Sequence, residues 1–435
     1  MINKVKECWN QLSSFRNKRK RCIDFTYGRQ WNDIIEVDGR FITEYEYIRR
    51  EGNVPLKNNL IRRIVRNVLG VFREKLIETL DSVYSGPLSD IAMENSLPEL
   101  FSRSMEEFLI SGMVVHRKGF GILNGKSGVW TQNVSPESFF FNTDSRDFRG
   151  NDLKMVGQVH KVDFTDWSKA FVKSPADYRK ALEIFGDSGR HVKVTEVWQK
   201  EMVPEYLVHN RQNGTVKRIS PEEKRRQMYS GLASKWVLSE KWRYYFITDN
   251  GTLLLSGDSP YLDGSHPFVV KCYPFLDGEI QSLVADMIDQ QRYTNRLITL
   301  YDWVIRASAK GVLLMPEGAV APGNLKNVAD QWGRFNGVIV YKSDPIRPEP
   351  KQINSNLSNI GITDLLEIQL KMMEDVSGVN GILQGNTSGG NVSGALYNSQ
   401  TTNAMYSLTD LLETFNSFVK ECGRKDEMLL RQTIG

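Results

Sequence analysis

The chain has 435 residues, of which 40% are hydrophobic and 25% charged, so it has ample core for roughly two to four structural regions. Its net charge of +4 excludes a protein that is polybasic throughout. No apolar run approaches the ~20 residues of a membrane span, and the N-terminus lacks the apolar core of a signal peptide. We therefore expect a chain that is made in the cytosol and does not enter a membrane.

The cysteines and histidines indicate neither a disulfide framework nor a metal site. The cysteines form no CxxC pair, and no two histidines are three or four residues apart. Scattered cysteines fit a reducing compartment, and we expect no metal and no other cofactor. The residues concerned are Cys8, Cys22, Cys272 and Cys422, with His116, His160, His191, His209 and His266.

Residues from 1 to about 115 carry mainly helical patterns. An amphipathic pattern begins near Trp9 and is followed by a basic run over 16–21. This run reads as the polar face of a helix or a protein contact, with a nucleic-acid arm as the alternative. A second helix follows Pro55, and a third over 97–110 ends at the helix-stopping pair Ser111-Gly112. The apolar face of the second helix contains Leu60, Ile64, Val68 and Phe72.

From 113 to about 275 the apolar period becomes that of strands. Asn124-Gly125 and Asn213-Gly214 are typical hairpin turns, and a helical insert lies near 167–184. Aromatic residues cluster around Trp236, Trp242, Tyr244 and Tyr245, and we interpret them as core or subunit interface, with a binding β-domain as the alternative. With the helices on either side, this region predicts an α+β fold. The expected strands cover 113–116, 128–131, 193–198, 206–209, 244–247 and 268–272.

From about 279 the helical period returns. A helix over roughly 280–309 would be about 45 Å long at 1.5 Å per residue. Short strands are expected at 312–315 and 337–341, and a second helix over about 357–377 carries apolar residues on one side. The last helix begins near Ser393. Its apolar residues are Leu408, Leu411, Leu412, Phe415, Phe418, Val419 and Cys422.

A loop rich in glycine, asparagine and serine joins these last two helices. A structureless loop of about 14 residues inside a compact domain is usually functional or disordered. No lysine or arginine occurs from 372 to 419, in a chain that is otherwise dense with basic residues. The loop is therefore a candidate functional segment, and a mobile surface loop without a partner is the alternative.

Three features resemble catalytic motifs, but their context argues against catalysis. Gly186-Asp-Ser-Gly189 copies a protease nucleophile motif without the glycine that should follow, so we interpret it as a turn. Gly125-Lys126-Ser127 resembles the end of a phosphate-binding loop, but Phe120 stands where the first glycine is needed, which favours a hairpin tip. Asp286 and Asp289 share a helical face without a neighbouring metal or acid–base partner. We predict no active site.

The order of these elements resembles the portal, or head–tail connector, proteins of tailed bacteriophages. The similar segments are Asp-Met-Ile-Asp-Gln-Gln-Arg-Tyr-Thr-Asn-Arg at 286–296, Ser377-Gly-Val-Asn380 and Ser393-Gly-Ala395. Asn-Asn-Leu-Ile-Arg-Arg-Ile-Val at 58–65 and Leu109-Ile-Ser-Gly-Met113 also resemble the family's N-terminal wing. The resemblance covers most of the chain in order.

The resemblance implies a division of the chain into portal segments. The wing would cover 1–278, with a helical part over 1–115 and a strand-rich part over 116–278. A stem helix over 279–310, a small β clip over 311–355, a second stem helix over 356–378 and a tunnel loop over 379–394 would follow. A long helix over 395–435 would lead towards a crown, and because the sequence stops at Gly435 we expect a short crown or a truncated sequence.

The resemblance also implies a non-enzymatic role in the virion. Twelve copies would form a ring at one capsid vertex, with a channel for packaging and ejecting double-stranded DNA. The ring would dock terminase and head–tail adaptor or neck proteins and contact major capsid and scaffold proteins, after synthesis in the host bacterial cytoplasm. The alternatives are another phage neck or collar component, or a DNA-packaging enzyme subunit, which the missing phosphate-binding loop and missing acidic triad disfavour.

Two groups of candidate site residues follow from this family reading. A tunnel loop without cations would touch the DNA backbone without holding it, because each cation that neutralises a phosphate adds affinity. Cations in the clip would dock partners or contact DNA, with a solvated positive face as the alternative. The loop residues are Gln384, Asn386, Thr387, Ser388, Gly389, Gly390 and Asn391, and the clip residues are Lys326, Arg334, Lys342, Arg347 and Lys351.

The stem carries a further set of cations whose role the sequence leaves open. They would line the channel, pair with aspartates of the same helix, or pair with a neighbouring subunit, and we expect the last for most of them because a ring needs two complementary surfaces on each copy. The cations are Arg292, Arg296, Arg306 and Lys310, and the aspartates are Asp286, Asp289 and Asp302.

Overall fold

The computed structural model describes most of the chain and divides it into two compact units. The described residues are 2–123, 125–142, 144–147, 149–185, 191–209, 215–226, 233–310, 312–314, 326–328, 330, 351–353, 361–379 and 394–434. The first unit comprises Met1–Tyr27, Leu60–Ile288 and Glu374–Gly435. The second unit comprises Gly28–Asn59 and Asp289–Met373.

The first unit combines helices with antiparallel sheets, which agrees with the predicted α+β class. The helices are α1 (Ile2–Gln11), α2 (Ser13–Thr26), α4 (Leu60–Val83), α5 (Leu88–Glu94), α6 (Leu97–Ser111), α7 (Phe164–Phe171), α8 (Pro175–Phe185), α9 (Pro221–Arg225) and α13 (Gly394–Ile434). The helices predicted after Pro55, over 97–110, near 167–184 and from about 393 are thereby confirmed.

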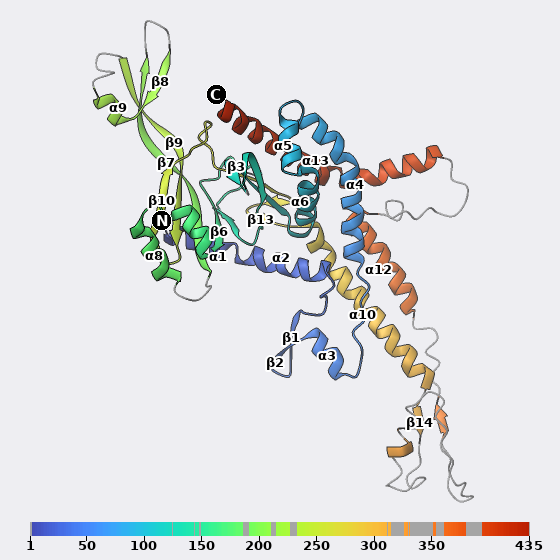
Figure 1. Cartoon of the computed structure of the whole chain (residues 1–435). Coiled ribbons are helices and arrows are strands. Elements are labelled where there is room, and N and C mark those ends of the chain that lie inside the picture. The colour runs from blue at the N-terminus through green and yellow to red at the C-terminus, as the bar shows by residue number, and fades with distance from the viewer. Residues whose placement is uncertain are drawn as a thin grey trace, which may run out of the picture. The chain divides into compact units, whose positions relative to one another are not determined.

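Two sheets and a short hairpin complete the first unit. One sheet has the order β11-β3-β4, and the larger sheet has the order β10-β9-β7-β6-β5 with β8 paired to β7. Strands β7 and β9 form a long ribbon that carries α9 near β8 (Figure 1). The strands are β3 (Met113–Leu123), β4 (Lys126–Asn133), β5 (Phe139–Phe141), β6 (Met155–Val162), β7 (Val192–His209), β8 (Val216–Ile219), β9 (Ala233–Thr248), β10 (Leu253–Asp258), β11 (Phe268–Cys272), β12 (Phe275–Leu276) and β13 (Glu279–Ile280).

The structure corrects two details of the predicted strands. The runs over 193–198 and 206–209 are not separate strands but parts of the 18-residue strand β7, which pairs with β9 from Val194 to His209. The aromatic group on β9 is also divided. Trp242 belongs to the core, Tyr244 and Tyr245 pack against it, and Trp236 is exposed.

Helix α13 is a central core element of the first unit. All seven of its predicted apolar residues, from Leu408 to Cys422, are buried. Phe415 lies with its ring centroid 5.0 Å from that of Phe72 on α4, and Phe418 lies 6.3 Å from Phe101 on α6. Edge-on aromatic contacts of this kind add to the free energy gained by burial.

The second unit is built around parts of two helices, α10 (Leu283–Lys310) and α12 (Ile362–Ser377), which also contribute residues to the first unit. Leu297, Val304 and Ile362 form its buried cluster. The remaining elements are β1 (Ile34–Val37), β2 (Arg40–Thr43), α3 (Glu44–Arg50) and the antiparallel pair β14 (Val312–Leu314) and β15 (Lys351–Ile353). The predicted helix over 280–309 is confirmed, and the one predicted over 357–377 is confirmed from Ile362 onward, while 357–360 lie outside the described residues.

The β1–β2 hairpin was missed in a region expected to be mainly helical. Its strands pair from Ile34 with Thr43 to Val37 with Arg40. The turn residues Asp38 and Gly39 have φ values of 51° and 72°. An Asp-Gly pair is a strong hairpin signal because both residues adopt positive φ easily, so the sequence did carry the information.

Candidate functional site

The seven predicted tunnel-loop residues, from Gln384 to Asn391, lie outside the described residues, but the entry to this segment is defined. Helix α12 ends at Ser377, and Gly378 follows with φ of 68°. The Ser407 hydroxyl of α13 donates to the Gly378 carbonyl at 2.7 Å. A Cβ at position 378 would lie 2.9 Å from Ser407 Oγ, so the positive φ and this close approach both require glycine. The segment therefore leaves α12 at a position fixed against α13.

Of the five predicted clip cations, only two fall within described residues. Lys326 is exposed on a short helical piece over 326–328. Lys351 begins β15, whose partner across the ladder is Leu314. Arg334, Lys342 and Arg347 lie outside the described residues.

Arg292 and Arg296, two of the four predicted stem cations, pair within the chain with acidic residues that lie outside α10. Arg292 and Arg296 both donate to Glu44 Oε1, the latter at 2.6 Å. Arg292 Nε also lies 3.5 Å from Asp33 Oδ2. Glu44 is buried at the first turn of α3, behind the capping box of Thr43 and Glu46, where the helix dipole favours a carboxylate. The side chains of Arg306 and Lys310 lie outside what the structure describes.

Polar residues of α10 hold the segment before α4 in place. Gln291, Asn295 and Thr299 recur every four residues and are all buried. Asn295 Oδ1 accepts from the Asn58 backbone N–H at 3.1 Å, and Thr299 Oγ1 accepts from that of Leu56 at 3.1 Å. The run at 286–296 therefore contacts the run that begins at Asn58. Two of the segments that resemble the portal family are thus in contact with each other.

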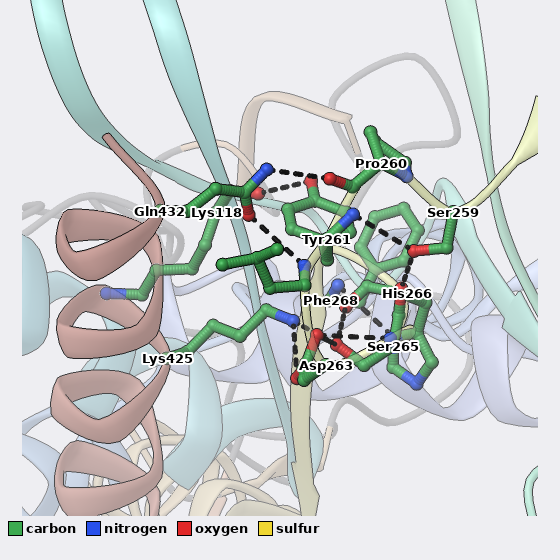
Figure 2. A network of polar contacts seen from close by, with 11 residues as sticks. Lys118, Ser259, Pro260, Tyr261, Asp263, Ser265, His266, Phe268, Lys425 and Gln432 are labelled. Carbon is green, nitrogen blue, oxygen red and sulfur yellow. Dashed lines mark hydrogen bonds and ion pairs between the residues drawn. The ribbon is translucent and has the colours of Figure 1, made fainter. Parts of the chain in front are cut away.

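Helix α13 is held in the first unit by a polar network at its C-terminal end (Figure 2). Lys425 donates to Ser265 Oγ, lies 3.4 Å from Asp263 Oδ2, and sits 4.4 Å from the ring centre of Tyr261. Gln432 donates to the Pro260 carbonyl at 2.7 Å and accepts from the Leu262 N–H at 3.2 Å. The segment 259–266 thus supplies the hydrogen-bond partners of Lys425 and Gln432, which lie two helical turns apart on α13.

A fully buried ion pair also holds α13. Lys118 Nζ of β3 is 2.5 Å from Asp426 Oδ2 of α13, and Tyr84 donates to the same oxygen at 2.9 Å. Burial raises the pKa of the Asp426 carboxyl, although Lys118 acts in the opposite direction. An isolated buried charge is very costly, so the pair fixes the position of α13 along β3.

The buried pair of His116 and Cys422 is chemically inert. Cys422 Sγ lies 3.7 Å from His116 Nδ1, and His116 Nε2 lies 2.7 Å from Ser104 Oγ. Burial lowers the pKa of His116 well below 6.5, and burial raises the pKa of Cys422 to about 12. A neutral thiol beside a neutral imidazole is a poor nucleophile, so this geometry is a packing contact.

The motifs that resembled catalytic sequences receive structural roles where they are described. Ser127 pairs with Ile122 and Lys126 with Leu123 across the β3–β4 hairpin, which confirms the predicted hairpin tip. Gly186–Gly189 lies outside the described residues. Within the described ranges, no three histidine, cysteine or acidic side chains are grouped as a metal would need, and no helix is long and apolar enough to cross a membrane.

The basic run over 16–21 partly turns towards the chain itself. Arg19 is buried and forms two hydrogen bonds with Glu107, at 2.8 and 2.9 Å. Arg16 lies 3.9 Å from the ring centre of Trp9. Lys18 and Lys20 are exposed. Lys18 and Lys20 therefore agree with the predicted polar helix face, whereas Arg16 and Arg19 contact the chain itself.

The family model of phage P22-like portal proteins matches residues 2–433. The chain therefore belongs to the P22-like portal protein family, a family of structural proteins and not of enzymes. No curated protein matches the chain.

Proposed function

We propose that the chain forms a closed ring of twelve copies at one vertex of a tailed-phage capsid, and that double-stranded DNA passes through the centre of the ring. Family membership supports the portal role. The observation that carries the ring is the distribution of apolar side chains on α10 and α12 in the second unit. Both helices expose large apolar residues beside the stripe that they bury within the chain.

On α10 the exposed apolar residues flank the buried stripe on both sides. Leu297 and Val304 are buried, whereas Leu300, Tyr301 and Trp303 are exposed. At about 100° per residue, Leu300 and Trp303 fall on one side of the stripe and Tyr301 on the other. A helix that is apolar around most of its circumference is normally buried on several sides. A ring supplies this burial, because each copy has one neighbour on each side.

The proposed roles of the individual segments follow from the portal resemblance. In our proposal α10 and α12 form the stem, 311–355 the clip that docks terminase and head–tail adaptor or neck proteins, and 379–394 the tunnel loop. The wing would face major capsid and scaffold proteins in the virion, after assembly from chains made in the host cytoplasm. Lys326, Arg334, Lys342, Arg347 and Lys351 are the cations proposed to act at the clip.

The proposed tunnel loop allows DNA to slide. It belongs to a stretch without lysine or arginine from 372 to 419, so it adds no cation–phosphate contacts that would slow translocation. Replacing Thr387 and Asn391 by lysine should leave ring assembly intact and slow DNA packaging. An alanine pair at the same positions is the matched control, and packaging at the normal rate in the lysine variant would contradict the low-friction role.

The mass of the purified protein tests the ring itself. Twelve copies of the 49.8 kDa chain give a particle of about 600 kDa with annular views in negative stain. A compact monomer that persists at high concentration and in the presence of the phage scaffold protein would contradict the proposal.

A further inference from the structure

A pocket of about 460 Å³ lies in the second unit between α3, the segment before it and α10. Its apolar lining comes from both sides, and its polar lining includes Glu44 and Arg296. The volume lies within the usual range of binding pockets. Trp303 is 49% exposed at this site. The apolar lining residues are Trp31, Ile35, Tyr47, Ile48, Leu300 and Trp303.

The walls of this pocket are fixed by hydrogen bonds. Trp31 Nε1 donates to the Leu56 carbonyl at 3.2 Å, and Leu56 is in turn bonded to Thr299 on α10. Glu44, at the start of α3, accepts hydrogen bonds from Arg292 and Arg296 of α10. The pocket is therefore preformed, and filling it requires little rearrangement.

Helix α12 carries an apolar stripe that suits such a pocket. Leu365, Ile368 and Met372 are exposed and recur at i, i+3 and i+7, which places them on one face. Ile362 and Met373 are buried on a different face. Helix α12 thus has two apolar faces, of which the chain itself covers one.

Rotational symmetry brings this stripe to the level of the pocket. Copies of a ring are related by pure rotation, so surfaces that meet lie at the same height along the axis. Ile362 shares a buried cluster with Leu297 and Val304 of α10. The pocket residues Leu300 and Trp303 lie between these two positions on α10. Leu365 and Ile368, one to two helical turns from Ile362, therefore lie within roughly 10 Å of that height.

We propose that the pocket of each copy receives the Leu365–Ile368–Met372 stripe of the adjacent copy. The proposal rests on the proposed ring and names the contact that closes it. Each ring interface then buries two apolar surfaces that differ from each other, as heterologous contacts require. Glu44, which lines the pocket with Arg296, also pairs with Arg292 and so connects α3 to α10 beside the proposed contact.

A disulfide test places the two surfaces against each other. Leu300→Cys and Ile368→Cys are combined in one chain, the assembled protein is oxidised, and the products are separated under denaturing, non-reducing conditions. Each copy then joins the next, so we expect a ladder of covalent multimers. The single variants L300C and I368C are the matched controls for the native cysteines, and they should give no ladder.

The outcomes separate this contact from the ring. A ring by mass together with a ladder supports the pocket contact. A ring without a ladder, or with only an intrachain disulfide of shifted mobility, overturns the pocket contact and leaves the ring standing. A wild-type protein that never forms a ring overturns the proposed function first, and the contact falls with it.

Charge substitution gives an independent measurement. Ile368→Glu should reduce the fraction of chains in rings at least tenfold, because a carboxylate would enter an apolar pocket. Ile77→Glu is the matched control, since Ile77 is also an exposed helical isoleucine, at 63%, and lies on α4. Unchanged circular dichroism shows that both variants fold. Equal ring fractions for I368E and I77E would overturn the proposal.

Discussion

Helices α13 and α12 are both strongly apolar, but the chain covers them to different extents. On α13 the apolar residues from Leu408 to Cys422 are all buried within the first unit. On α12, in the second unit, Ile362 and Met373 are buried while Leu365, Ile368 and Met372 remain exposed. A helix that is apolar on more than one side is normally buried on more than one side, and the chain itself covers only one apolar face of α12. Under the proposed ring, the second apolar face of α12 is the part of this comparison that assembly would cover.

The largest expected difference between the two helices is in stability. Phe415→Ala should lower the free energy of unfolding by about 3–5 kcal/mol, because it leaves a cavity among Phe72, Phe108 and Phe418. Ile368→Ala should change it by no more than about 0.5 kcal/mol in the dilute, unassembled chain. Urea unfolding of both variants measures the difference. Equal losses would mean that the chain itself covers Ile368.

The buried ion pair offers a second comparison within the first unit. Asp426→Ala should cost about 3–5 kcal/mol in urea unfolding, since it leaves the Lys118 ammonium buried without its partner. The double variant Lys118→Met with Asp426→Leu removes both charges and should recover most of that loss. If the double variant were as unstable as the single one, packing and not charge would be responsible.

The pH dependence of stability reports on His116. Its folded pKa lies well below 6.5 because the ring is buried, with Lys118 adding to the effect. The unfolded chain therefore binds a proton near pH 6.5 that the folded chain does not bind, and stability falls as pH drops below that value. The slope should be about 1.4 kcal/mol per pH unit from this group. His116→Gln should remove this contribution between pH 6.5 and 5, and an unchanged slope would assign it elsewhere.

The smallest expected effect concerns the second unit's ion pairs. Arg296 is 54% exposed in its side chain and shares Glu44 with Arg292. Arg296→Gln should therefore cost no more than about 1 kcal/mol, and Arg292→Gln, at the less exposed position, should cost more. Thermal unfolding of the two variants gives the order. The reverse order would make Arg296 the main partner of Glu44.

The sequence predicted the apolar core of α13 well because a helical stripe is a local signal. Phe415, Val419 and Cys422 recur at helical spacing, and Asp426 continues the same stripe. On β3, Lys118 lies on the same strand face as the buried residues Val114 and His116, because the three positions are two residues apart. Both patterns placed a charge on a buried face, but they did not show that the two charges meet, because the residues are 308 positions apart.

The partners of the α10 arginines could not be predicted for the same reason. Glu44 lies 248 positions before Arg292, in a region expected to be helical, where an exposed glutamate is ordinary. Its burial depends on the β1–β2 hairpin, which directs the chain into α3. In the sequence, the signal for that hairpin is the Asp38-Gly39 turn. The tunnel-loop residues and three of the clip cations remain sequence predictions, since they lie outside the described residues.

Oxidative footprinting of Trp303 tests most directly whether the exposed faces of the second unit are buried by assembly. The comparison is between the wild-type ring and the Ile368→Glu chain, with Trp167, only 3% exposed, as the internal control for an intact fold. We expect Trp303 to be oxidised several-fold more slowly in the ring, and Trp167 to be unreactive in both. Equal oxidation of Trp303 in the ring and in the unassembled chain would contradict the account.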